Sequence, residues 1–131
     1  MRFEYNHFAF LGPESQHAAE AAECAREQGQ FWQYHDILFA NQHGENQGAF
    51  GEDALKAFAA ALPLDENAFN LCLASRQYEA EVQSETAAGQ QRGVRSTPTL
   101  FINGEKVEGA LPFAQLQPRI EAILAASGSG K

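Results

Sequence analysis

A short apolar run followed by an Asn-Gly pair is the feature that most limits how this chain can fold. Residues 99–102 read Thr-Leu-Phe-Ile, Asn103 and Gly104 follow directly, and the chain returns through residues 106–109. Asn-Gly between apolar segments is a strong signal for a two-residue hairpin turn, because such turns require positive φ angles. The sequence therefore predicts an antiparallel β-hairpin near its C-terminal end.

The segment before the hairpin has the spacing of helices. Pro13 suits the first turn of a helix that runs to about residue 28, with Gly29 as its C-terminal cap. Apolar residues at helical spacing, the stop at Pro63 and the N-cap residue Asp65 predict further helices up to Gly93. We therefore expect a block of helices over residues 13–93.

The two ends of the chain complete the pattern. Residues 2–10 alternate in the manner of a strand and then become apolar on both faces, which predicts an inner strand. Apolar residues at helical spacing predict a last helix, with Pro118 in its first turn or bending it. The order strand, helices, hairpin, helix is typical of an α/β or α+β domain.

Composition excludes several classes of function. The chain has 131 residues and a net charge of −8, and its nine Lys and Arg residues are scattered, so nucleic acid and anionic membranes are unsuitable partners. A run of about 20 apolar residues, which a membrane-spanning helix needs, is missing, and residues 1–5 do not resemble a signal peptide. Because the first strand would begin at once, we expect a segment upstream to be missing.

Several segments resemble, in their order along the chain, the parts of one known protein family. Residues 96–104 read Ser-Thr-Pro-Thr-Leu-Phe-Ile-Asn-Gly and resemble the cis-proline loop and hairpin of thioredoxin-fold proteins. Residues 18–25 and 28–39 resemble the helical insertion of the DsbA-like branch, and residues 2–10 resemble the strand after the redox helix. The resemblance covers essentially the whole chain.

This resemblance implies an incomplete thioredoxin-like α/β fold with an α-helical insertion. A single truncated domain would cover residues 1–126, with 1–12 and 94–126 as its thioredoxin part and 13–93 as the insertion, and residues 127–131 would be a flexible tail. In the family, a Cys-x-x-Cys pair opens a helix before the strand resembled by residues 2–10, and that βα unit is absent from this sequence. We therefore expect no catalytic residue in this chain.

The expected function is that of a fragment or variant of a DsbA-like thiol–disulfide oxidoreductase, inactive alone. Alternatives are a working oxidoreductase when the missing redox unit is supplied, and a non-catalytic module that binds peptides or itself. The family implies extended, cysteine-containing protein substrates and an extracytoplasmic compartment, the periplasm or cell envelope. Binding of glutathione or another small ligand is a weaker alternative, and no cofactor is expected.

The two cysteines leave alternatives open. Cys24 and Cys72 both lie on apolar helical faces, as buried free thiols would, and neither has a second ligand at the spacing of a zinc site. By resemblance to family members with a disulfide inside the insertion, we favour a structural Cys24–Cys72 bond. The resemblance also implies a cis Thr97–Pro98 peptide, with Ser96, Thr97 and Pro98 as the substrate-binding loop.

Other polar residues receive structural interpretations. The four histidines, His7, His17, His35 and His43, form no pattern with a nucleophile or a set of metal ligands, so we expect no metal site. Glu20, Glu23 and Glu27 at helical spacing predict a solvated face.

Loss of the strand before the redox helix would leave two strands with unpaired edges, to be closed by re-pairing, by strand exchange in a homodimer, or by another chain.

Overall fold

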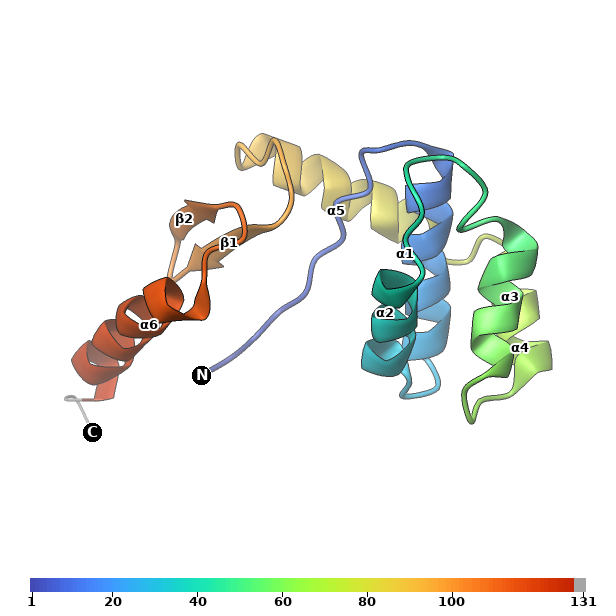
Figure 1. Ribbon diagram of the computed structural model, residues 1–131, viewed down its shortest axis with the longest axis horizontal. Coiled ribbons are helices and arrows are strands. Elements are labelled where there is room, and N and C mark those ends of the chain that lie inside the picture. The colour runs from blue at the N-terminus through green and yellow to red at the C-terminus, as the bar shows by residue number, and fades with distance from the viewer. Residues whose placement is uncertain (129–131) are drawn as a thin grey trace. The chain divides into compact units, whose positions relative to one another are not determined.

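A computed structural model describes residues 1–128 of the chain (Figure 1). It divides into two compact units, which we call the helical unit, residues 6–89, and the hairpin unit, residues 1–5 together with 90 onward. The boundaries expected from the sequence lay at residues 12/13 and 93/94, a few residues further along. Each unit is described separately below.

The helical unit is built on α1 (Pro13–Arg26), which packs against α2 (Phe31–Ala40), α3 (Glu52–Ala60) and α4 (Glu66–Ala74) (Figure 1). Small residues on α1 allow its neighbours to approach closely, as ridge-into-groove packing requires. The main cluster of buried side chains joins these four helices: Ala18, Ala21, Ala22, Cys24, Ala25, Tyr34, Leu55, Ala59, Phe69, Cys72 and Leu73.

Local sequence signals place these helices as predicted. Pro13 opens α1, and Gly29 adopts φ 73 just after it, a left-handed conformation that costs glycine little. The Asp65 side chain accepts a hydrogen bond from the Ala68 amide at 3.0 Å and caps α4. At the centre of the unit, the buried Tyr34 hydroxyl donates to the Leu55 carbonyl at 2.9 Å, so its polar end is satisfied.

The hairpin unit contains β1 (Thr99–Ile102) and β2 (Glu105–Glu108), paired antiparallel with Thr99 opposite Glu108 and Ile102 opposite Glu105. Asn103 and Gly104 have φ angles of 49 and 87, so the Asn-Gly turn predicted from the sequence is confirmed. α5 (Glu79–Gln91) leads into this unit, and α6 (Phe113–Gly128) ends it.

The structure narrows one prediction about the last helix and corrects another. Pro118 does not lie in the first turn of α6, the first of its two predicted roles, but further inside the helix, where it removes one amide from the helical hydrogen bonds. The helix also includes Ser127 and Gly128, which the sequence assigns to a flexible tail, because sequence signals define the end of a helix only to within one or two residues. The rest of the expected tail, 129–131, lies outside the described residues.

The predicted strand over residues 2–10 is wrong, since this segment has no regular secondary structure among the described residues. A strand needs a neighbouring strand to complete its hydrogen bonds, and the described sheet contains β1 and β2 alone. Part of the segment bonds to side chains of α5 instead. The amides of His7 and Ala9 donate to Glu85 Oε2 at 2.6 Å and to Thr86 Oγ1 at 3.0 Å.

Candidate functional site

The loop between α5 and β1 holds the three residues predicted to bind substrate. Ser96, Thr97 and Pro98 are all exposed, and the Thr97–Pro98 peptide bond is cis. The Ser96 carbonyl accepts a hydrogen bond from Thr99 Oγ1 at 2.7 Å, and the Pro98 carbonyl accepts one from the Gly109 amide at 2.9 Å. These bonds attach the loop at both ends to the hairpin that follows it.

Thr97, between these two anchored carbonyls, has a main chain that is free to bind something else. Within the described residues 1–128, neither its amide nor its carbonyl makes a hydrogen bond, and the residue is exposed. A main-chain donor and acceptor presented side by side are the groups that an extended peptide needs in order to pair with a strand-like segment. The loop therefore presents the main-chain groups that pairing with an extended peptide requires.

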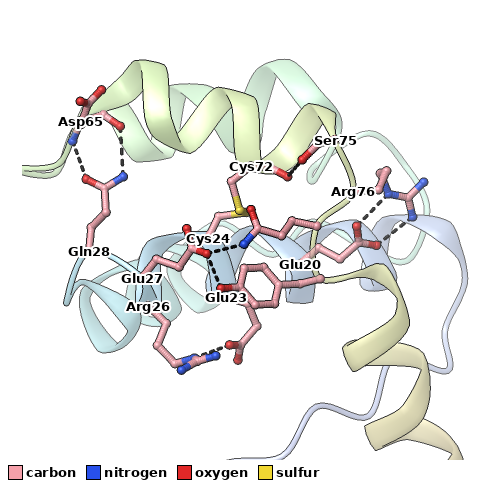
Figure 2. The surroundings of a disulfide bond; sticks show 12 residues. Glu20, Glu23, Cys24, Arg26, Glu27, Gln28, Asp65, Cys72, Ser75 and Arg76 are labelled. Carbon is pink, nitrogen blue, oxygen red and sulfur yellow. Dashed lines mark hydrogen bonds and ion pairs between the residues drawn. A yellow bond between two sulfur atoms is a disulfide. The ribbon is translucent and has the colours of Figure 1, made fainter.

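The two cysteines lie in the helical unit. A disulfide joins Cys24 of α1 to Cys72 of α4, with Cα atoms 5.9 Å apart (Figure 2). The residues are 1% and 4% exposed, so the bond lies in the packed core between the two helices. The described chain has no free cysteine. Burial shields both sulfur atoms from an incoming thiolate, which must reach a sulfur for thiol–disulfide exchange to occur.

Glu20 does not belong to the solvated face predicted from its spacing. It is 1% exposed, and Arg76 donates two hydrogen bonds to its carboxylate, from Nε to Oε1 at 2.7 Å and from Nη2 to Oε2 at 2.8 Å (Figure 2). Burial acts to raise the pKa of Glu20, but hydrogen bonds from Arg76 and Gln16 outweigh it and hold the pKa below its ordinary value. The carboxylate is therefore ionised and ties α1 to the end of α4.

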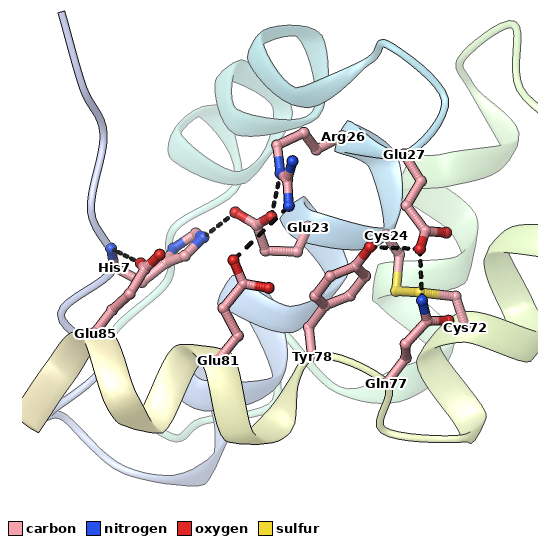
Figure 3. Close-up of polar contacts among 10 residues, drawn as sticks. All are labelled: His7, Glu23, Cys24, Arg26, Glu27, Cys72, Gln77, Tyr78, Glu81 and Glu85. Atoms are coloured by element: carbon pink, nitrogen blue, oxygen red, sulfur yellow. Dashed lines mark hydrogen bonds and ion pairs between the residues drawn. A yellow bond between two sulfur atoms is a disulfide. The ribbon is translucent and has the colours of Figure 1, made fainter.

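Glu23 is also buried, contrary to the sequence prediction. His7 Nε2 lies 2.8 Å from Glu23 Oε1, and Arg26 binds the other carboxylate oxygen (Figure 3). Burial acts to raise the pKa of Glu23, yet the hydrogen bonds from His7 and Arg26 lower it overall. Because an ionised carboxylate only accepts hydrogen bonds, His7 Nε2 carries the proton. This pairing attaches the segment before α1 to the helical core.

Glu27 alone of the three glutamates is exposed as predicted, although it accepts hydrogen bonds from Gln77 and Tyr78 beside the disulfide (Figure 3). The sequence reasoning missed the His7–Glu23 pair. The alternation of residues 2–10 does not predict this pair, because Phe3 and Tyr5, which share the predicted strand face of His7, are exposed.

The other predicted polar residues stay apart. His17 lines a pocket together with Glu52 and Arg76, and His35 lies beside the neighbouring Asp36 on α2, with Nδ1 3.1 Å from Oδ1. Among residues 1–128, no group of three or more His, Cys, Asp and Glu side chains could hold a metal ion. Within the same residues, no helix is long and apolar enough to cross a membrane.

Comparison with known proteins identifies the fold and the family of this chain. A family model described as thioredoxin matches residues 1–122. The structure superposes on the crystal structure of BdbD from Bacillus subtilis with a TM-score of 0.80, at 21% identity, over 92% of this chain and 66% of that one. The fold is therefore thioredoxin-like, in the DsbA-like α/β form with a helical insertion. The chain belongs to the thioredoxin family, which confirms the resemblance found in the sequence.

Two relatives by sequence are informative. Disulfide bond formation protein D of Bacillus subtilis is 25% identical over 133 residues, which cover 95% of this chain and 57% of that protein. Na(+)/H(+) antiporter NhaA 3 of Salinispora tropica is 34% identical over 129 residues, 97% of this chain and 19% of the antiporter. The chain thus spans about a fifth of the antiporter's length, and the antiporter's name describes that whole protein.

Proposed function

We propose that this chain binds extended, cysteine-containing polypeptides at Ser96, Thr97 and Pro98, as the substrate-docking part of a DsbA-like thiol–disulfide oxidoreductase. The observation that carries the proposal is the exposed, unbonded main chain of Thr97 between two anchored carbonyls. Family membership over residues 1–122 supports the same reading. The chain does not perform the redox step alone.

The chemistry of the cysteines supports a role in peptide binding without the redox step. A redox cysteine needs an accessible thiolate, favoured by the positive N-terminal end of a helix, and a second cysteine nearby to resolve the mixed disulfide. Cys24 and Cys72 sit in the last turns of α1 and α4, where the helix dipole disfavours negative charge, and both are buried. They stabilise the insertion and leave the redox step to another cysteine pair.

A second candidate is a working oxidoreductase formed when a Cys-x-x-Cys unit is supplied by another segment or a second chain. The greater length of the relatives favours it, since this chain spans 57% of the disulfide bond formation protein and 66% of BdbD. An oxidising, extracytoplasmic compartment belongs to both candidates and is supported by the Cys24–Cys72 bond. An in-frame Cys-x-x-Cys sequence encoded upstream of Met1 would favour this second candidate.

Self-association is a further part of the proposal. β1 pairs with β2 alone among the described strands, so its other edge presents unpaired amides and carbonyls. A second copy could satisfy them by adding a strand. Sedimentation velocity over a hundredfold range of concentration tests this, with a concentration-dependent dimer expected and a monomer throughout counting against it.

Peptide docking is tested by titrating the ¹⁵N-labelled chain with a capped, extended peptide that carries serine in place of cysteine. The amide signals of Ser96, Thr97 and Thr99 should shift together and saturate. Thr97→Pro removes the proposed donor, and Thr97→Ala retains it while removing the side chain. We expect Thr97→Ala to bind like the unchanged protein and Thr97→Pro to bind about tenfold more weakly, the size of one net hydrogen bond.

The contrary result is equally clear. If the largest shifts occur in the helical unit, or if Thr97→Ala weakens binding as much as Thr97→Pro, the main chain of Thr97 is not the docking group. The spectrum of each variant shows whether the hairpin is still folded. The shift of the Thr97 amide in the unchanged protein tests the same point without any substitution.

A further inference from the structure

Charge is divided unevenly between the two units. The helical unit contains three Lys and Arg against thirteen Asp and Glu, a net −10, and the hairpin unit contains six against four, a net +2. The proposed docking loop thus belongs to the unit that is positive within a strongly acidic chain. Local potential at a binding loop influences which peptides approach and remain there.

Two of these cations differ from the rest. Eight Lys and Arg residues fall within residues 1–128, and six of them have a carboxylate within 4.0 Å: Arg2, Arg26, Lys56, Arg76, Lys106 and Arg119. Arg92 and Arg95 are the two described cations that make no such pair. In a chain with seventeen acidic residues, unpaired neighbours immediately before the docking loop point to a partner outside the chain.

Arg92 is held in position by the hairpin. Its guanidinium carbon lies 3.7 Å from the centre of the Phe101 ring on β1, a cation–π contact that leaves the N–H edges of the fork available. Lys106 Nζ donates to the Gly93 carbonyl at 3.2 Å, which attaches the backbone next to Arg92 to β2. The Arg92 side chain is exposed, and the backbone beside it is attached to the hairpin.

Arg95 is exposed and directly precedes Ser96. The pKa of Glu108 is lowered chiefly by a hydrogen bond from Lys106 and to a smaller extent by the charge of Arg95, so Arg95 lies within Coulombic reach of this carboxylate. Glu108 pairs with Lys106 at 2.9 Å and stands opposite Thr99 in the hairpin. Arg95 therefore lies beside the start of β1, with its own fork unoccupied.

We infer that Arg92 and Arg95 recognise acidic side chains of an extended peptide that is docked at Thr97. The inference deepens the proposed function and rests on it, since it names the class of substrate: cysteine-containing segments with Asp or Glu near the docked residue. A guanidinium fork matches a carboxylate with two parallel hydrogen bonds, so arginine suits this recognition better than lysine.

A short acidic peptide fits this surface better than a polyanion does. Binding to nucleic acid or to an anionic membrane needs several cations in a row, and the chain as a whole is strongly negative. At physiological ionic strength, charges beyond about 8 Å are largely screened. Two carboxylates next to the docked residue feel the two arginines, while a long polyanion also meets the repulsion of the acidic chain.

The test compares two capped peptides of equal length with a central serine, one with two glutamates beside it and one with two glutamines. Dissociation constants come from amide shifts of the full chain. The glutamate peptide should bind about three- to tenfold more tightly at low salt, the scale of two exposed ion pairs, and the preference should shrink as salt is added. Arg92→Gln with Arg95→Gln should abolish the preference and leave binding of the glutamine peptide unchanged.

Arg119→Gln with Lys56→Gln is the matched control, because it removes the same charge from positions that already have carboxylate partners. The preference for glutamate should survive in this control. Arg92→Lys keeps the charge without the planar fork, and we expect it to retain part of the preference.

The outcomes separate the inference from the proposed function. Equal binding of both peptides at the loop overturns the inference and leaves docking intact. A preference lost equally in the control variant also overturns it, since net charge would then suffice. If neither peptide moves the signals of Ser96 to Thr99, docking itself fails and the inference fails with it. Tighter binding to vesicles of phosphatidylglycerol than to either peptide would assign the arginines to a membrane.

Discussion

Removal of the Cys24–Cys72 bond gives the sharpest test of how the helical unit is held together. The two cysteines are 48 residues apart, and a cross-link that closes such a loop stabilises the folded chain by about 4 kcal/mol in the chain-entropy account. The bond also joins α1 and α4 inside the main cluster of buried side chains, so its loss acts directly on that cluster. We expect the Cys24→Ala, Cys72→Ala double variant to lose most of this free energy of unfolding.

The assay is urea unfolding followed by far-ultraviolet circular dichroism, which reports mainly on the helices. Unchanged protein measured with and without a reductant is the control, because reduction opens the loop and keeps both sulfur atoms in the core. A small additional loss in the double variant then measures packing alone. A loss below about 1 kcal/mol on reduction would refute the loop-closure reasoning and mean that the unfolded chain is hardly restrained by the bond.

Three further perturbations test other contacts. Glu20→Gln should lower the free energy of unfolding by about 2 kcal/mol, less than for a fully buried ion pair because the Arg76 side chain is 37% exposed. Since the pKa of Glu20 is below its ordinary 4.5, this stabilisation is present above pH 4.5 and is lost as the pH falls through the lowered pKa. If the difference in urea midpoint between the unchanged protein and the variant does not decrease in acid, the result contradicts this prediction. Asp65→Ala should cost about 1 kcal/mol through loss of the bond to the Ala68 amide, measured by thermal unfolding, with Asp65→Asn as the variant that retains the cap. Gly104→Ala should destabilise the hairpin by about 1 kcal/mol from its φ of 87 alone, because an added Cβ would have no atom of residues 1–128 within 4 Å apart from Gly104 and its two chain neighbours. Unchanged amide exchange in β1 and β2 would be the contrary result.

Local chemistry explains what the sequence predicted well. The Asn103-Gly104 turn, the Asp65 cap and the Pro13 helix start depend on residues within a few positions of one another, so each can be recognised in one sequence. The match of order and motifs to the DsbA-like family then gave the fold. These signals do not depend on how distant segments meet.

The errors concern residues whose partners are distant or absent. Glu20 and Glu23 have the helical spacing of a solvated face, but Arg76, 56 positions from Glu20, and His7, 16 positions from Glu23, hydrogen-bond to them inside the protein. Residues 2–10 have the alternation of a strand, yet strand formation also needs a neighbouring strand to pair with, and the described sheet contains β1 and β2 alone. Helical or strand periodicity alone contains neither kind of information.

The sequence also could not predict that Arg92 and Arg95 are the described cations that make no ion pair with a carboxylate. In the sequence, the nine Lys and Arg residues look scattered, because the carboxylate partners of six of them are identified only in the folded chain. Which charges remain available is a tertiary property.

The most direct test of the central claim is an insulin-reduction assay with dithiothreitol, run beside a thiol count on the purified chain. Docking without redox chemistry predicts no acceleration of insulin reduction, and it predicts that Cys24 and Cys72 react with a thiol reagent only after the protein is reduced and unfolded. Clear acceleration that disappears in Cys24→Ala or Cys72→Ala would contradict the account, because one of these buried cysteines would then be the reactive group.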